Sequence, residues 1–109
     1  MTVNDLAREL ELTALSVTDG DREIEGAYVG DLLSWVMGRA QSGNAWITIM
    51  SNINIVAVAA LTDVACVILA EDVTVEESVL NTAAQKGVNL LASGMTAYEL
   101  AKKLAALSI

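Results

Sequence analysis

The chain has 109 residues, of which 54% are hydrophobic, and its 6 Lys and Arg against 14 Asp and Glu give a formal net charge of −8. This length is enough for a single core, so we expect one domain over residues 1–109. The acidic balance argues against nucleic acid and against a membrane as partners, because both attract basic surfaces. The sequence has no His and one Cys, which excludes His-based catalysis, an intrachain disulfide and Cys-cluster metal sites. We therefore expect no metal and no cofactor.

The cellular compartment is predicted from the same composition. A single Cys suits a reducing cytoplasm. The first ten residues, MTVNDLAREL, lack the basic start and apolar core of a secretory signal. We accordingly expect a cytoplasmic protein.

The N-terminal half alternates between short helices and extended segments. Thr2 and Asp5 have the spacing of a capping box that opens a first helix. Extended segments over 12–17 and 24–29 follow, joined by a turn at residues 19–21, where the sequence is Asp-Gly-Asp. The remaining elements predicted for this half are a helix over 32–40 that Asp31 would cap, a turn at 43–44 and a strand over 45–50.

The C-terminal half is a regular alternation of helices and apolar strands. Ser51 or Asn52 would cap a helix that runs to about residue 62. A continuous apolar run over 64–69 is typical of a parallel strand covered on both faces. The later elements are a helix over 74–86 ended by Gly87, a strand over 88–92 and a helix from a Thr96–Glu99 capping box to 107. This alternation of strands and helices predicts a single three-layer α/β domain with a mainly parallel sheet and helices on both faces.

The predicted helix over 53–61 has almost no polar residue on any side. Because an outer helix normally keeps one polar face, this one must be covered all round. One interpretation places it beneath the acidic N-terminal third. The other, which we favour, packs it against a second copy in a two-fold homodimer. The interface residues named by this hypothesis are Trp35, Ile53, Val56, Ala57 and Ala60. The longer apolar stretch over 53–70 falls short of the about 20 residues of a membrane span, and Asp63 would lie near its centre.

No catalytic constellation is found. The chain has neither a phosphate loop nor a G-x-G-x-x-G motif, so we predict no catalytic residues and no enzyme activity. The acids between Asp19 and Glu25 lack the spacing of a calcium loop and are better explained as charges on an edge strand. Cys66 is interpreted as a small buried hydrophobe rather than a nucleophile. Trp35 and Trp46 have two open interpretations, packing and a stacking platform for a ring.

The candidate ligand site follows from the expected topology. Ligands of parallel sheets bind beyond the carboxyl ends of the strands, where helix N-termini present free N–H groups. Small polar residues at these ends suit a sugar, a ribose or a phosphate. Helix capping uses the same residue types, so capping alone and capping with binding both stay open. The candidate ligand-binding residues are Ser51, Asn52, Asn54, Ser93, Gly94 and Thr96.

One segment carries a family resemblance. Residues 26–38 read G-A-Y-V-G-D-L-L-S-W-V-M-G, and V-N-L-L and T-A-Y-E-L-A follow later. With these segments the chain resembles the DRTGG domain over residues 2–107, in particular the stand-alone short DRTGG proteins often found near iron-only hydrogenase genes. The resemblance implies a fold similar to the N-terminal domain of HPr kinase/phosphorylase. Relatives beside CBS domains or before phosphotransacetylase domains imply a regulatory or dimer-forming role.

The sequence departs from the DRTGG pattern at two strand ends. Ser51-Asn52 stands where the resemblance implies Asp-Arg, and Ala70-Glu71-Asp72 stands where it implies Thr-Gly-Gly. Asp21-Arg22 matches the family letters in the wrong segment.

We predict a self-associating regulatory or scaffolding domain that senses a small ligand such as an adenosine nucleotide, in a setting linked by resemblance to iron-only hydrogenases. The alternative is a pure dimerisation or protein-docking module without a ligand. An enzyme related to serine kinases is less favoured, with Glu71-Asp72 as the only acidic pair at a strand end.

Overall fold

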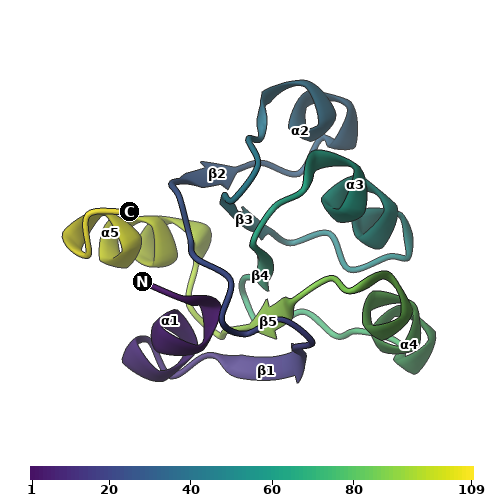
Figure 1. The fold of residues 1–109 in the computed structure, drawn as a ribbon, viewed down its shortest axis with the longest axis horizontal. Coiled ribbons are helices and arrows are strands. Elements are labelled where there is room, and N and C mark those ends of the chain that lie inside the picture. The colour runs from purple at the N-terminus through teal and green to yellow at the C-terminus, as the bar shows by residue number, and fades with distance from the viewer.

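The computed structural model describes all of residues 1–109 and contains one five-stranded sheet (Figure 1). Its strands lie in the order β1-β5-β4-β3-β2. The pairs β2–β3, β3–β4 and β4–β5 are parallel, whereas β1 pairs antiparallel with β5. The strands are β1 (Thr13–Ser16), β2 (Ala27–Val29), β3 (Ala45–Thr48), β4 (Cys66–Leu69) and β5 (Leu90–Ala92).

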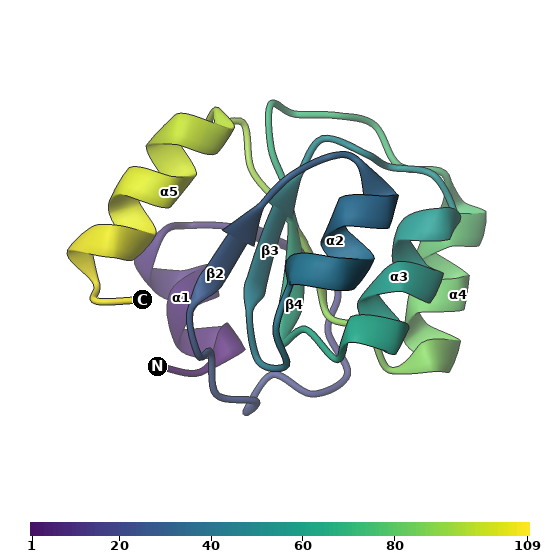
Figure 2. The ribbon, with the colours of Figure 1, turned by 90° about the horizontal axis from the view of Figure 1, so that it is seen from above.

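Helices cover both faces of this sheet (Figure 2). One face carries α1 (Val3–Glu9) and α5 (Ala97–Ala106). The other carries α2 (Leu33–Arg39), α3 (Asn54–Thr62) and α4 (Glu77–Lys86), with α3 packed between its two neighbours. This arrangement confirms the predicted three-layer α/β fold with a mainly parallel sheet. None of the five helices is long and apolar enough to cross a membrane.

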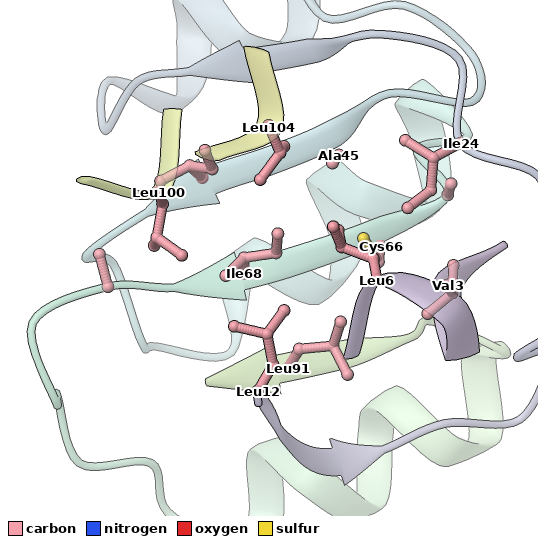
Figure 3. Packing of buried hydrophobic residues seen from close by; sticks show 13 residues of the cluster. Val3, Leu6, Leu12, Ile24, Ala45, Cys66, Ile68, Leu91, Leu100 and Leu104 are labelled. Atoms are coloured by element: carbon pink, nitrogen blue, oxygen red, sulfur yellow. The ribbon is translucent and has the colours of Figure 1, made fainter. Parts of the chain in front are cut away.

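Two apolar cores lie on either side of the central strands. All four residues of β4 are buried, as the continuous apolar run over 64–69 predicts for a strand that is covered on both faces. All four residues of β3 are buried as well. Figure 3 shows the core beneath α1 and α5, where Leu6 and Leu100 meet Ile68 of β4. Cys66 belongs to the same core, and burial raises the pKa of its thiol to about 12. Its interpretation as a buried hydrophobe is confirmed, since a protonated, inaccessible thiol is a poor nucleophile.

Local capping signals give correct helix ends at several places. Thr2 with Asp5, and Thr96 with Glu99, form complete capping boxes at the starts of α1 and α5. Gly87 ends α4 in the left-handed conformation with φ of 70°, which glycine adopts without steric cost. These predictions are confirmed because each depends on contacts within one turn of the chain.

The predicted cap of α2 is wrong. Leu32 is the N-cap residue of this helix, and no side chain caps it. Asp31 instead accepts hydrogen bonds from the Thr48 hydroxyl at 2.8 Å and from the Ile49 backbone N–H at 3.0 Å. The carboxylate has two donors at the end of β3, so it joins the loop before α2 to the neighbouring strand rather than starting the helix.

Other predicted boundaries are shifted. Helix α3 begins at Asn54 with Ile53 as its N-cap residue, so the prediction that Ser51 or Asn52 caps it is wrong. Asn52 accepts the Asn54 N–H at 2.9 Å in the turn before the helix. Helix α4 begins at Glu77 rather than at residue 74, which leaves an extended segment after β4. The extended segment predicted over 24–29 pairs within the sheet only over its last part, β2. The shift at α4 matters for function because the extended segment lines a cavity.

Candidate functional site

The carboxyl ends of β3, β4 and β5 lie at one edge of the sheet, because the three strands are parallel. The chain leaves this edge toward opposite faces. After β3 and β4 it enters α3 and α4, whereas after β5 it enters α5 on the other face (Figure 2). The predicted site residues are therefore divided between the two sides of the sheet.

The first cavity, called here the α3–α4 cavity, has a volume of about 610 Å³. It contains Ser51 and Asn52 of the predicted site. The extended segment before α4 and the first turn of that helix complete it. The lining offers three hydroxyl groups, one amide and one carboxylate, and no Lys or Arg. The lining residues are Ser51, Asn52, Ile53, Thr74, Glu76, Ser78 and Val79.

The second cavity, of about 540 Å³, lies on the other face beside α1 and α5. It contains Ser93 and Gly94 of the predicted site, together with Glu9, Glu11 and Lys103. Neither Asn54 nor Thr96 lines either cavity, and the Thr96 hydroxyl accepts the Glu99 N–H at 3.2 Å. The expectation of one pocket formed by all six residues is thus wrong, because the helices that follow β3 and β5 lie on opposite faces.

A pair of backbone hydrogen bonds connects the loops that follow β4 and β5. The Glu71 N–H donates to the Met95 carbonyl at 2.8 Å, and the Asp72 N–H donates to the Ser93 carbonyl at 2.9 Å. Glu71 and Asp72 both have positive φ angles, 59° and 57°, a conformation that favours glycine. These are two of the positions at which the sequence departs from the Thr-Gly-Gly pattern.

The residues Thr74, Glu76 and Ser78 were not predicted as site residues. They follow β4, whose carboxyl end was identified as a candidate region only through Glu71 and Asp72. The helix start predicted at residue 74 places Thr74 and Glu76 within regular helix, whereas the structure has them in the extended segment before α4. Ser78 lies in the first turn of α4 and lines the cavity because this segment brings the helix start beside the end of β3.

The two tryptophans have different environments. Trp46 is fully buried, and its indole N–H donates to the Gly30 carbonyl at 2.9 Å, so it packs in the core. Trp35 is 53% exposed on α2, and the Arg39 guanidinium lies 3.7 Å from the centre of its ring. This cation–π contact holds the ring at the surface.

The outer face of α3 is apolar, as the sequence indicates. Ala57 and Ala60 are exposed, and Ile53 and Leu61 are 45% and 72% exposed. Val56 is only 1% exposed and packs in the core against the sheet. Its assignment to the interface is wrong, because it lies on the inner side of the helix. Leu61 lies on the outer side.

A charged cluster lies near the end of α3. The Arg22 guanidinium donates to the Asp63 carboxylate at 2.9 and 3.1 Å, and the Ser42 hydroxyl donates to it at 2.5 Å. The bonds from Arg22, and then the one from Ser42, hold the pKa of Asp63 below its usual value. This cluster connects the segment before β2 to the end of α3.

No group of three or more His, Cys, Asp or Glu side chains is placed to hold a metal ion.

Comparisons with known proteins give a likeness among solved structures. No known family profile matches the chain, and no curated protein does. Among solved structures, it is similar to the CBS and DRTGG domains of the regulatory region of Clostridium perfringens pyrophosphatase, complexed with the activator diadenosine tetraphosphate. The TM-score is 0.74 at 12% sequence identity over 94% of this chain, which spans 45% of the length of that structure. The chain therefore has the DRTGG-like fold that the sequence resemblance predicts.

Proposed function

We propose that this chain is a non-catalytic regulatory domain that self-associates and binds a small ligand in the α3–α4 cavity. The observation that carries the proposal is its DRTGG-like fold, found also in a regulatory region solved with a nucleotide activator. The cavity lies at the carboxyl edge of parallel strands, the usual position for ligands in such sheets.

The chemistry of the cavity favours the nucleoside part of a nucleotide. Glu76 offers a carboxylate that can accept hydrogen bonds from ribose hydroxyls, and Thr74 and Ser78 add hydroxyl groups. The lining has no Lys or Arg to neutralise phosphates. Affinity then depends mainly on the adenosine moiety, and added phosphates contribute little.

A thermal-shift titration with adenosine, AMP, ATP and diadenosine tetraphosphate tests the ligand-binding part. A ligand at one hundred times its dissociation constant stabilises the native state by about 2.7 kcal/mol, which raises the midpoint of a domain of this size by several degrees. Ser78→Ala should reduce the shift. Ser34→Ala is a matched control, because Ser34 is also the exposed second residue of a helix, α2, but does not line the cavity.

The alternative function is a dimerisation or protein-docking module without a ligand, and the exposed apolar side chains of α2 and α3 favour it. Absence of a thermal shift with all four compounds would refute ligand sensing and leave this alternative. The setting implied by the family resemblance is an iron-only hydrogenase system. A kinase-related activity would require Asp72 at the end of β4, and ATP turnover that Asp72→Asn abolishes would support it.

A further inference from the structure

The outer face of α3 has the character of a buried surface although it faces solvent. Ile53, Ala57, Ala60 and Leu61 are all exposed there. Asn54 is the only exposed polar residue of the helix. An outer helix of a small α/β domain normally exposes charged or polar side chains, so this face is expected to be covered.

The charge distribution indicates what covers it. No charged residue occurs between Arg39 and Asp63, a stretch that includes all of α3, in a chain whose formal net charge is −8. Two copies of so acidic a chain repel each other when they approach through charged faces. Contact through the α3 faces avoids this repulsion, because α3 carries no charged side chain. The same face on both copies then forms the contact, which is the arrangement produced by a two-fold axis.

A stable dimer interface needs more area than α3 alone provides. A standard interface covers about 800 Å² per partner, roughly one seventh of the 5616 Å² surface of this chain. A helix of nine residues is too short to supply this alone. Helix α2 packs beside α3 and adds the exposed apolar side chains Leu32, Trp35 and Met37. The two helices together present a wider apolar surface than α3 alone.

We propose that a second copy of this chain covers the α2–α3 face, with the two α3 helices crossing at Ala57 and Ala60. Small side chains at these positions allow the helix axes to approach closely. Leu61 and Ile53 pack on either side of the crossing, and Trp35, held by Arg39, lies toward the rim. This proposal rests on the self-association proposed above and names its surface.

The test compares two exposed helical alanines. Sedimentation equilibrium from micromolar to near-millimolar concentration measures the dissociation constant of the wild type, Ala57→Glu and Ala105→Glu. Ala105 is exposed on α5, on the opposite face of the sheet. Both variants add the same charge, but only Ala57→Glu places it on the proposed interface. We expect Ala57→Glu to weaken the dimer by about 100-fold or more, because a two-fold axis brings two new carboxylates together. Ala105→Glu should leave the dissociation constant nearly unchanged.

A second variant and the urea midpoint keep the test independent of folding defects. Leu61→Ser removes an exposed side chain and should weaken the dimer while leaving the urea midpoint of the monomer within error. A wild type that stays at 11.5 kDa at every concentration would refute self-association itself. The wild type could instead form a dimer that Ala57→Glu and Leu61→Ser weaken no more than Ala105→Glu does. That result would refute the proposed interface but not self-association.

Discussion

The loop after β4 provides a quantitative test of backbone strain. Glu71 has a φ of 59°, and the left-handed conformation costs a residue with a side chain roughly 1–2 kcal/mol. Its side chain is exposed, and its backbone N–H bond to Met95 does not depend on the side chain. Glu71→Gly therefore removes the strain without removing a contact. The greater backbone entropy of glycine in the unfolded chain offsets about 0.5–1 kcal/mol of this gain.

The expected net effect is an increase of about 0.5–1 kcal/mol in the free energy of unfolding, from the difference between these two effects. Urea denaturation monitored by circular dichroism measures it through the shift in midpoint at unchanged slope. Lys102→Gly is the control, because Lys102 is an exposed residue in the interior of α5, where glycine costs about 1 kcal/mol. If Glu71→Gly proves as destabilising as Lys102→Gly, the strain argument fails.

Three further predictions concern other parts of the fold. Cys66 should resist thiol reagents at neutral pH in the native state and react promptly in urea, because burial raises its pKa to about 12; rapid native-state labelling would contradict this. Arg22→Ala should lower the free energy of unfolding only modestly, because the ion pair between Arg22 and Asp63 is exposed. This difference from the wild type should be constant at neutral pH and lost in acid. The folded pKa of Asp63 lies below its ordinary 3.8, so the stabilisation is present above 3.8 and disappears as the pH falls through the folded value; pH-dependent urea midpoints measure it, and a difference that grows in acid would contradict the assignment. Asn89→Leu should cost about 4 kcal/mol in a denaturant titration, because Asn89 is buried and makes four hydrogen bonds to backbone groups, each contributing about 1 kcal/mol; a loss below about 1 kcal/mol would show that other groups replace these bonds.

The features predictable from the sequence are those that depend on neighbouring residues. The Thr96–Glu99 capping box and the Gly87 cap require one turn of chain each, and both are correct. Asp31 fails by the same criterion, because its partner Thr48 is 17 residues away and becomes a neighbour only when β2 and β3 pair. A cap signal in the sequence cannot show that a distant donor competes for the same carboxylate.

The orientation of α3 could not be read from its residues. A helix with one polar face shows in its sequence which side turns to solvent, but residues 53–61 have no such face. The inward position of Val56 and the outward position of Leu61 are set by packing against the sheet and α2. The division of the candidate site has a similar origin. Whether a helix after a parallel strand covers one face or the other depends on the whole topology, so Ser51 and Ser93 were expected together but line separate cavities.

The antiparallel edge strand has a consequence for the order of folding. Strand β1 is among the first segments of the chain, yet its only partner is β5, near the C-terminal end. Contacts between segments so distant in sequence close a large loop and form slowly. During synthesis β1 therefore stays unpaired until β5 has been made, when almost the whole chain has emerged. The many acidic residues of the N-terminal third place negative charge near this unpaired strand. Such charge discourages premature association of the strand with other chains.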